Sequence, residues 1–458
     1  MTDWIPRLGT GHGPRYAAIV TQLEEDIASG RVKPGTRLLP QRDMAERLGL
    51  SVGTVSKAYA EAEQRGLISG EVGRGTFVLR RDNGGAGMAK AAEERDVNLA
   101  LNVPPSTGEE EVIAAILSDI VTDGSADGLL GYLSHQGRRD HREAAASWLA
   151  AHGMSADPDR VFITHGAQHA LSIALGMVAA PGDTVLTESL TYSGMFALSA
   201  QCGYRLTGVA IDRHGILPQA LDDAFGRTGA RVLYAMPTLQ TPTGTVMPLE
   251  RRQEIAEILR RRDAYLLEDD AYGFLFETAP RPIAALVPER SFYAVSFAKC
   301  LAPGLRVGAM VAPEAFRDRC INAIRATGWM ATPIMAEAVA RLIVNGGLAR
   351  QARLKREKAI QRVNIVRRVL ADWLPESDAE AAFHVWLPLP VGRTVTSLVT
   401  QAAQSGITLV PPHALRPHDP VSQGIRLCLG APRSEVALEG ALQVIRRILE
   451  SAETISFV

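Results

Sequence analysis

The pattern that most constrains the fold begins near residue 97, where short apolar segments alternate with amphipathic ones through most of the remaining chain. The segments AQHALSIALGMVA and LERRQEIAEILRRR carry apolar residues at helical spacing. Strands that are apolar on both faces are covered on both faces, and helical crossovers make neighbouring strands parallel. This region therefore predicts an α/β unit with a mostly parallel central sheet. The expected strands are RVFITH, TVLTE, RLTGVAI, ARVLYAM, AYLLED, FYAVSF and RVGAMVA.

Changes of pattern predict the domain boundaries. Residues 15–80 have the spacing of three helices and a hairpin, and the charged, glycine-rich stretch RRDNGGAGMAKAAEERD after them is typical of a linker. After residue 360, FHVWLPL and GIRLCLG predict strands of a smaller α+β unit. We expect a first domain at 1–80, a linker at 81–96 and a second domain at 97–458, with a large part at about 97–355 and a small part at about 356–458.

Composition sets limits on cellular context and on chemistry. The net charge of −1 excludes a polycation, so only local placement of cations could argue for nucleic-acid binding. The four cysteines are scattered without a CxxC pair or a histidine-rich cluster, which favours reduced thiols and predicts no metal site. We find no pattern of a signal peptide and no apolar run near the ~18 residues that cross a bilayer. We therefore expect a soluble, cytoplasmic protein without a membrane partner.

The N-terminal unit carries polar side chains where a helix-turn-helix would meet DNA. Ser51 is a good N-cap for the third helix, and the N-terminal residues of such a helix can reach base edges in the major groove. Three short helices are also a common packing module, and the helical pattern alone does not separate the two interpretations. The candidate DNA-binding residues are Arg42, Ser51, Thr54, Lys57, Arg74 and Gly75.

A specific resemblance favours DNA binding. The stretch PGTRLLPQRDMAERLGLSVGTVSKAYAEAEQRGLISGEVGRGTFV resembles the winged helix-turn-helix of GntR-type transcription regulators over its whole length. Such families often carry arginine directly after the recognition-helix serine, where this chain has Val52. Valine offers only apolar contact, for instance with a thymine methyl group. We therefore expect phosphate contacts from Arg42, Lys57 and Arg74 to supply much of the affinity, and base specificity stays open.

Lys299 closes the apolar run SFYAVSFA, and its role has two interpretations. A lone lysine at a strand end usually extends to water, whereas a Schiff-base lysine must be partly desolvated. The stretch SFAKCLAPGLRVG resembles the cofactor-lysine motif of fold-type I pyridoxal-phosphate enzymes, the aspartate-aminotransferase superfamily. That resemblance implies that Lys299 forms the internal aldimine with pyridoxal 5′-phosphate, and that Ser296 and Arg306 bind the cofactor phosphate.

Further motifs match the same superfamily. In THGAQHAL, the residues Gly166, Ala167 and Gln168 lie between a strand and a helix, where backbone N–H groups hold phosphate. In EDDAYGF, the resemblance places Asp269 at the pyridine nitrogen and Tyr272 at the ring's phenolic oxygen, with Asp270 as the competing carboxylate.

Three more residues are implied by the resemblance alone. Tyr192 would stack on the cofactor ring, although a tyrosine packed under a loop is nearly as common. Tyr132 would reach the phosphate of a neighbouring subunit, which predicts a homodimer. Arg426 in GIRLCLG would hold the α-carboxylate of an amino compound, although an arginine at a strand end is often a surface ion pair.

One position departs from the superfamily pattern. Members usually read N-P-T-G where this chain has Thr241-Pro242-Thr243-Gly244. The usual asparagine hydrogen-bonds the ring oxygen and helps to set the aldimine pKa. Thr241 offers a hydroxyl and no amide, so we expect cofactor binding to survive and catalytic tuning to change.

Together the two halves resemble the MocR family of bacterial transcription regulators, a GntR-type winged helix-turn-helix joined to a fold-type I aminotransferase-like domain with a smaller C-terminal α+β subdomain. The resemblance implies a pyridoxal-phosphate-dependent regulator that binds DNA and senses a small amino compound as an external aldimine. A different arrangement of the domains would then reposition the two winged helices. The alternatives are an active aminotransferase with an accessory DNA-binding domain, and a large domain that serves only as a dimerisation scaffold.

Overall fold

The computed structural model describes residues 4–6, 15–28, 31–33, 36–64, 67–71, 75–78, 97–278, 280–375, 379–390, 392–415 and 423–451. The chain divides into two compact units, Met1–Glu93 and Glu94–Val458. The candidate DNA-binding residue Arg74 lies outside the described residues, and Gly75 begins a strand.

The first unit is a three-helix core with a two-stranded antiparallel wing. The helices are α1 (Arg15–Ala28), α2 (Gln41–Leu48) and α3 (Val52–Gln64), and the wing pairs β1 (Ile68–Glu71) with β2 (Gly75–Val78). Gly49 ends α2 with φ +62°, a left-handed conformation that favours glycine and turns the chain toward α3. Val55 and Ala58 on α3 are fully buried against Ile19 and Val20 on α1. The predicted winged helix-turn-helix is confirmed.

A seven-stranded sheet forms the centre of the second unit. Its four parallel strand pairs lie toward one edge, and β12 runs antiparallel to both of its neighbours. This is the mostly parallel sheet that the apolar strand segments predict. In spatial order the strands are β4 (Val161–Thr164), β12 (Gly308–Val311), β11 (Ser291–Ser296), β10 (Tyr265–Asp269), β9 (Val232–Ala235), β5 (Thr184–Glu188) and β6 (Arg205–Val209).

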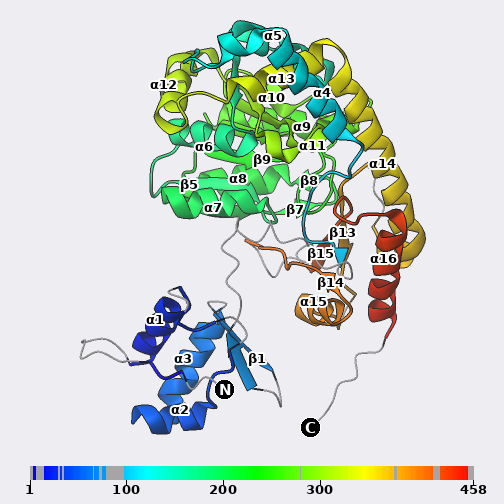
Figure 1. Cartoon of the computed structure of the whole chain (residues 1–458). Coiled ribbons are helices and arrows are strands. Elements are labelled where there is room, and N and C mark those ends of the chain that lie inside the picture. The colour runs from blue at the N-terminus through cyan, green and yellow to red at the C-terminus, as the bar shows by residue number, and fades with distance from the viewer. Residues whose placement is uncertain are drawn as a thin grey trace. The chain divides into compact units, whose positions relative to one another are not determined.

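Helices cover both faces of this sheet (Figure 1). Phe162 on β4 packs in one hydrophobic cluster with α6, whereas its neighbours Val161 and Ile163 pack in a second cluster with α5 and α13. This alternation follows from the two-residue period of a strand. The helices of the second unit are α4 (Glu109–Thr122), α5 (Arg139–Ala151), α6 (Ala167–Val178), α7 (Ser193–Cys202), α8 (Pro218–Thr228), α9 (Leu249–Arg261), α10 (Ile283–Leu286), α11 (Phe297–Cys300), α12 (Arg317–Thr327), α13 (Pro333–Val344), α14 (Gly347–Leu370), α15 (Val395–Gln404) and α16 (Glu435–Glu450).

The smaller part of the second unit is tied to the sheet by α14. This 24-residue helix runs without interruption past residue 356, where the small part was expected to begin, and packs against α16 (Figure 1). The small part holds the antiparallel pair β13 (His384–Pro388) and β15 (Gly424–Cys428). The first strand of the unit, β3 (Val97–Asn98), joins it by pairing with β14 (Ile407–Thr408). A further short hairpin joins β7 (Ile211–Asp212) and β8 (Gly215–Ile216).

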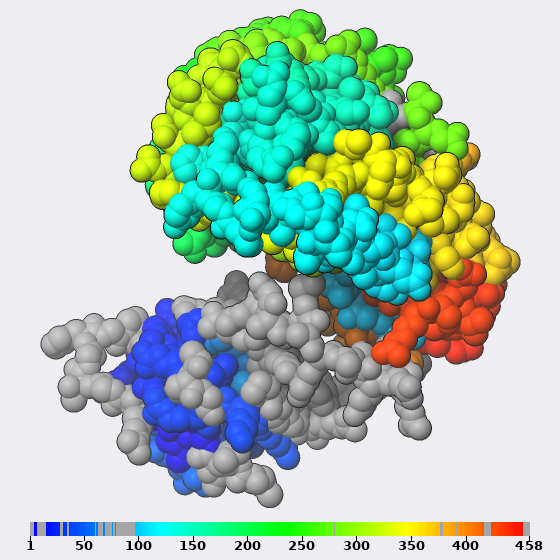
Figure 2. All heavy atoms as spheres, turned by 45° about the horizontal axis from the view of Figure 1, so that its top comes forward, coloured from blue at the N-terminus to red at the C-terminus, as the bar shows by residue number. Residues whose placement is uncertain are grey.

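On one face of the second unit α4, α5 and α13 lie together, and Figure 2 shows this region in cyan beside yellow. Among the described residues, no helix is both long enough and apolar enough to cross a membrane.

Candidate functional site

The candidate site lies at the carboxyl edge of the sheet. Strands β4, β5, β9, β10 and β11 run in the same direction, so the residues that follow them meet at one edge. Because β12 runs the other way, Arg306, which precedes it, reaches the same edge. Ligands of open α/β sheets bind outside this carboxyl edge.

Lys299 lies on the short helix α11, directly after β11, and its amine is largely withdrawn from water. Nζ donates a hydrogen bond to the backbone carbonyl of Asn102 and lies 5.8 Å from the ring centroid of Tyr272. Burial lowers the pKa of Lys299 to about 8, and the positive charge of Arg426 adds to this effect, while Cys428 and Asp269 oppose it. An amine with this pKa is partly neutral near pH 7, which a nucleophilic lysine requires.

Asp269 ends β10 and is 4% exposed. Its Oδ2 accepts a hydrogen bond from the Tyr234 hydroxyl at 3.0 Å, and its Oδ1 has no hydrogen-bond partner among the described residues. Burial raises the pKa of Asp269 to about 7, and Asp270 raises it further, while Tyr234 and Lys299 lower it. The competing carboxylate Asp270 is instead occupied by the Tyr293 hydroxyl and the Gly273 N–H, both at bond distances of 2.5–2.6 Å.

Tyr272 is buried beside Asn102 and Thr241. Its hydroxyl accepts a hydrogen bond from Asn102 Nδ2 at 2.8 Å. Burial raises the pKa of Tyr272, and the neighbouring Thr241 hydroxyl lowers it in part. Thr241 Oγ1 is itself buried and makes no hydrogen bond within the described part of the chain. The position that departs from N-P-T-G therefore lies next to the tyrosine hydroxyl.

Gly166 and Arg306 form a cradle at the N-terminus of the twelve-residue helix α6. Gly166 has φ +80° and ψ 174°, and a Cβ built there would lie 3.0 Å from Arg306 Nη2. Arg306 donates from Nη2 to the His165 carbonyl at 3.2 Å. Gly308 must also lack a side chain, because a Cβ there would lie 2.7 Å from Gly166 Cα. The N-terminus of α6 has no side-chain cap, and uncapped N–H groups beside a guanidinium suit an anion.

Ser296, Ala167 and Gln168 border the cradle with different contacts. Ser296 Oγ caps α11 by accepting from the Ala298 N–H at 3.2 Å. Ala167 is the first residue of α6. Gln168 donates from Nε2 to the Gly194 carbonyl at 3.1 Å, and its Oε1 is buried without a partner among the described residues.

Tyr192 lies in the same electrostatic environment. Burial raises its pKa, Asp269 raises it further, and Arg306 and Arg426 lower it. A Cβ at Gly194 would lie 2.2 Å from Tyr192 Cε1, so this glycine allows the ring to lie against the backbone. The structure thus brings Tyr192 near the cation of the cradle and near the carboxylate of β10.

Arg426 and Tyr132 occupy contrasting environments. Arg426 on β15 is partly buried, donates from Nη2 to the Ala100 carbonyl at 2.9 Å and influences the pKa of Lys299. Tyr132 is 85% exposed, and its ring centroid lies 5.5 Å from that of Trp329. Tyr132 lines a surface hollow together with His165, the residue before Gly166.

In the first unit, four of the candidate DNA-binding residues lie on or beside the two helices of the helix-turn-helix. Arg42 and Lys57 are exposed, and Lys57 Nζ lies 4.1 Å from the ring centroid of Tyr16. Ser51 Oγ accepts from the Thr54 N–H at 3.2 Å and so caps α3. The adjacent Val52 is 46% exposed at the first turn of α3.

Comparison with known proteins matches both units. Residues 15–78 match the family "Bacterial regulatory proteins, gntR family", and residues 94–445 match "Aminotransferase class I and II". The protein named "Probable rhizopine catabolism regulatory protein MocR" of Rhizobium meliloti is 30% identical over 90% of this chain and 89% of its own length. The chain belongs to the MocR family of GntR-type regulators.

Other relatives share this MocR architecture or one half of it. The HTH-type transcriptional regulator YdeF of Bacillus subtilis, named as uncharacterized, is 26% identical over 98% of this chain and 97% of its own length. The structure of kynurenine aminotransferase from Pyrococcus horikoshii in complex with PMP covers 78% of this chain and 91% of its own, with a TM-score of 0.70 and 24% identity. LysN of Thermus thermophilus, complexed with N-(5′-phosphopyridoxyl)-L-leucine, has a TM-score of 0.69 at 24% identity, with 78% and 92% of the two chains covered. These likenesses show the fold-type I fold.

The residues of this MocR-family chain fit pyridoxal 5′-phosphate, as the buried polar atoms indicate. Asp269 Oδ1, Thr241 Oγ1, Asn102 Oδ1 and Gln168 Oε1 are all buried and unpartnered within the described residues. Buried polar atoms usually have partners, so a cluster of exceptions indicates groups that a ligand satisfies. Asp269 Oδ1 could accept from a protonated ring nitrogen, Lys299 could supply the amine, and the Gly166–Arg306 cradle suits the phosphate.

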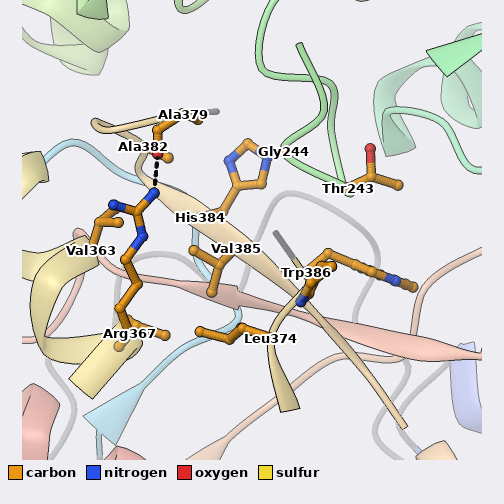
Figure 3. Close-up of a pocket in the computed structure, with 12 residues that line it drawn as sticks. Thr243, Gly244, Val363, Arg367, Leu374, Ala379, Ala382, His384, Val385 and Trp386 are labelled. Carbon is orange, nitrogen blue, oxygen red and sulfur yellow. Dashed lines mark hydrogen bonds between the residues drawn. The ribbon is translucent and has the colours of Figure 1, made fainter. Parts of the chain in front are cut away.

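Sequence reasoning missed three residues of the site. Tyr234 lies inside an apolar strand, His384 starts β13, and Asn102 lies in the irregular segment after β3. Figure 3 shows His384 between Gly244 and Val385, at the wall of a small apolar cavity between α14 and β13. No local motif marks any of the three, because their partners are distant in the sequence.

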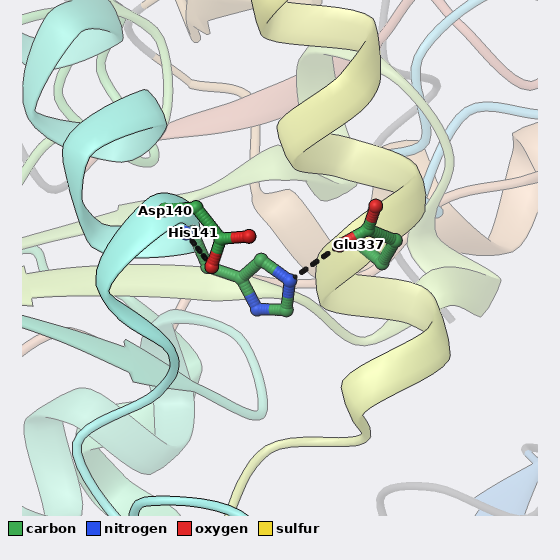
Figure 4. Close-up of side chains that lie close together, drawn as sticks. All are labelled: Asp140, His141 and Glu337. Carbon is green, nitrogen blue, oxygen red and sulfur yellow. Dashed lines mark hydrogen bonds and ion pairs between the residues drawn. The ribbon is translucent and has the colours of Figure 1, made fainter. Parts of the chain in front are cut away.

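A second cluster in this MocR-family chain is an ion-pair network. Asp140, His141 and Glu337 bring ligand atoms within 4.8 Å of one another (Figure 4). Each carboxylate already pairs with an arginine, Arg138 with Asp140 at 2.5 Å and Arg341 with Glu337 at 2.7 Å. Within the cluster, the contact between His141 Nε2 and Glu337 Oε2 at 2.8 Å joins α5 to α13.

Proposed function

We propose that the protein is a cytoplasmic, homodimeric transcription regulator that binds DNA through its GntR-type unit and senses a small amino compound at a pyridoxal 5′-phosphate site. Membership of the MocR family supports the regulator and the DNA partner. The exposed patch formed by Tyr132 and Trp329 beside His165 supports a second subunit at the site. Bacterial DNA lies in the cytoplasm, so the DNA partner supports a cytoplasmic location.

The observation that carries the cofactor assignment is the half-satisfied carboxylate of Asp269. Its Oδ2 is occupied by Tyr234, and its buried Oδ1 is left to accept one more hydrogen. When bound, pyridoxal 5′-phosphate supplies an aldehyde that reacts with amines and a ring that withdraws electrons. Asp269 would hold the ring nitrogen, Lys299 would hold the aldehyde carbon, and Gly166 with Arg306 would hold the phosphate.

Arg426 defines the class of the sensed compound. Its guanidinium donates to the carbonyl of Ala100, Lys299 donates to the carbonyl of the nearby Asn102, and the charge of Arg426 lowers the pKa of the Lys299 amine. A guanidinium binds a carboxylate with two parallel hydrogen bonds, which a lysine ammonium cannot copy. We therefore expect an amino compound that also carries a carboxylate. Its binding alters DNA affinity only if it binds two arrangements of the protein with different free energies.

The test is DNA binding by the full-length protein with and without pyridoxal 5′-phosphate and a panel of amino acids. We expect visible absorbance on adding the cofactor, a spectral change with some carboxylated amines, and an altered DNA affinity with the same amines. Arg426→Lys should keep the cofactor absorbance and weaken the amine response about tenfold or more. If the unaltered protein acquires no visible absorbance, the second unit is only a scaffold and the proposal fails.

A second candidate function is an active aminotransferase. The protein of Saccharolobus solfataricus named as an uncharacterized aminotransferase, SSO0104, is 30% identical over 77% of this chain and 92% of its own length. The set Lys299, Asp269, Tyr272 and Arg426 would permit at least a half-reaction. Incubation with an amino-acid panel and a keto acid separates the two functions, because only an enzyme gives multiple turnovers.

A further inference from the structure

The direction of one hydrogen bond at His384 determines a chain of others. His384 Nε2 lies 3.0 Å from the Gln240 carbonyl oxygen, which can only accept, so Nε2 carries the proton. Burial lowers the pKa of His384 to about 3, and the charge of Arg426 contributes, so the ring is neutral. Nδ1 of a neutral ring protonated at Nε2 is an acceptor.

Asn102 must therefore present its amide nitrogen to His384. Its Nδ2 lies 3.2 Å from His384 Nδ1 and 2.8 Å from the Tyr272 hydroxyl oxygen. The amide nitrogen has two hydrogens, and these two contacts use both. The orientation of the Asn102 amide is thus fixed by the tautomer of His384, and the Tyr272 oxygen receives a hydrogen from Asn102.

A tyrosine hydroxyl that accepts one hydrogen still has its own proton to donate. Among the described residues, no acceptor takes the Tyr272 proton at hydrogen-bond geometry, and the Tyr272 ring centroid lies 5.8 Å from Lys299 Nζ. The proton is therefore available to a ligand atom beside Lys299. Without Asn102 the hydroxyl could rotate and act as an acceptor instead.

We propose that Asn102 is a positioning residue, held by His384, that fixes the Tyr272 hydroxyl as a hydrogen-bond donor to a ligand oxygen at Lys299. The inference rests on the proposed cofactor site, where that oxygen is the phenolic oxygen of pyridoxal 5′-phosphate. Position 241, which lies beside the Tyr272 hydroxyl, is a threonine in this chain and has no amide group. The amide group near this hydroxyl comes instead from Asn102. The donor stabilises the negatively charged form of the ligand oxygen, so losing it favours the protonated form.

The test is a spectroscopic pH titration of the full-length protein loaded with pyridoxal 5′-phosphate. In Asn102→Ala the midpoint of the absorbance change should rise by about one pH unit, the scale of one hydrogen bond to a charged group. The isosteric N102D should shift the midpoint upward too, because a carboxylate accepts the Tyr272 proton instead of donating. Because N102D preserves the shape of the side chain, its titration midpoint can be measured instead if N102A does not fold.

Two further variants separate positioning from loss of structure. Asn98 Oδ1 accepts from the Ala100 and Leu101 N–H groups at 2.9 Å and shapes the same segment without touching Tyr272. Asn98→Ala should lower thermal stability and leave the titration midpoint unchanged. Adding Thr241→Asn to N102A should return the midpoint toward its original value, because position 241 lies beside the Tyr272 hydroxyl.

The possible outcomes are distinct. If the titration midpoints of N102A and N102D equal that of the unaltered protein, the inference is overturned, while the proposed cofactor site still stands. An equal shift in Asn98→Ala would also overturn it, because the effect would then be structural. If the unaltered protein shows no cofactor absorbance, the proposed function itself fails, and the inference fails with it.

Discussion

The Tyr234 hydroxyl donates to Asp269 Oδ2 at 3.0 Å, deep at the carboxyl edge of the sheet, and the other carboxylate oxygen has no partner among the described residues. Tyr234 is fully buried, so its hydroxyl cannot turn to water. A buried carboxylate with one free oxygen destabilises the ligand-free protein when it is charged. A cationic group of a ligand would reverse that effect.

The free energy of unfolding of the ligand-free protein should therefore fall as pH rises, because Asp269 becomes charged. The pKa of Asp269 is about 7 in the folded protein and 3.8 in its ordinary state, so the folded state binds more protons between these values. The free energy of unfolding then falls as pH rises from about 4 to about 7. Asp269→Asn should gain stability relative to the unaltered protein from pH 5 to 7, by at most about 1.4 kcal/mol per pH unit.

Urea denaturation of both cofactor-free proteins, followed by tryptophan fluorescence, measures this difference. Burial also raises the pKa of Glu268, which Asp269 does not affect, so its contribution is the same in both proteins. Asp269 adds to the raised pKa of Glu188, so Asp269→Asn should reduce the pH dependence of Glu188 as well, in the same direction. Tyr234→Phe removes a hydrogen bond that favours the charged form of Asp269, so the pKa of Asp269 should rise further. The free energy of unfolding of this variant should therefore keep falling up to a higher pH than in the unaltered protein. A difference between the proteins that does not vary with pH would contradict a raised pKa at Asp269.

Lys299 should control cofactor attachment in a pH-dependent way. At pH 7 a pKa of about 8 leaves about one-tenth of the amine neutral and reactive. The rate of cofactor attachment, followed by absorbance, should therefore increase with pH up to about 8 and then level off. Lys299→Ala and Lys299→Arg should abolish the visible absorbance and leave the oligomeric state unchanged. Unaltered absorbance in either variant would rule out Lys299 as the attachment point.

Gly308 should be more sensitive to substitution than its neighbour Gly304. A Cβ at Gly308 would lie 2.7 Å from Gly166 Cα and from the Val295 carbonyl oxygen, whereas a Cβ at Gly304 meets nothing within 4 Å. Gly308→Ala should cost about 1–3 kcal/mol and weaken cofactor binding, because the backbone of the cradle must move. Gly304→Ala should change stability by less than about 0.5 kcal/mol. Thermal unfolding and cofactor titration test both, and equal behaviour would argue against a tight cradle.

The sequence predicted the helices and strands whose apolar residues repeat at a regular spacing, and the site residues that lie in recognisable motifs. The apolar runs predicted each long strand of the sheet, and the order of strand and helix predicted its parallel pairing. Parallel pairing of β10 with β11 brings Asp269 to the edge where Lys299 lies, and the two antiparallel pairings of β12 bring Gly166 to the same edge. The motif matches therefore marked residues that the fold places together.

The remaining features depend on contacts that no local pattern records. Asn102 meets His384 across 282 residues, and each is a single polar residue beside apolar neighbours. The strands β3 and β14 have two residues each, too few to show a period. The continuous helix α14 spans the expected boundary near residue 356, because helical spacing persists while the packing partners change.

DNA binding by the full-length protein should separate the roles of Lys57 and Val52. Lys57 is an exposed cation near Tyr16, and Val52 is an exposed apolar side chain at the start of α3. Lys57→Ala should weaken binding to all duplexes and reduce the salt slope of log affinity by about 1, because one phosphate contact is lost. Val52→Ala should keep the slope and weaken binding only to selected sequences, since an apolar side chain releases no counterions. Titrations at several salt concentrations, on a sequence selected from a random pool and on an unrelated duplex, measure both effects. A sequence-selective loss in Lys57→Ala, or a changed slope in Val52→Ala, would contradict this division of roles.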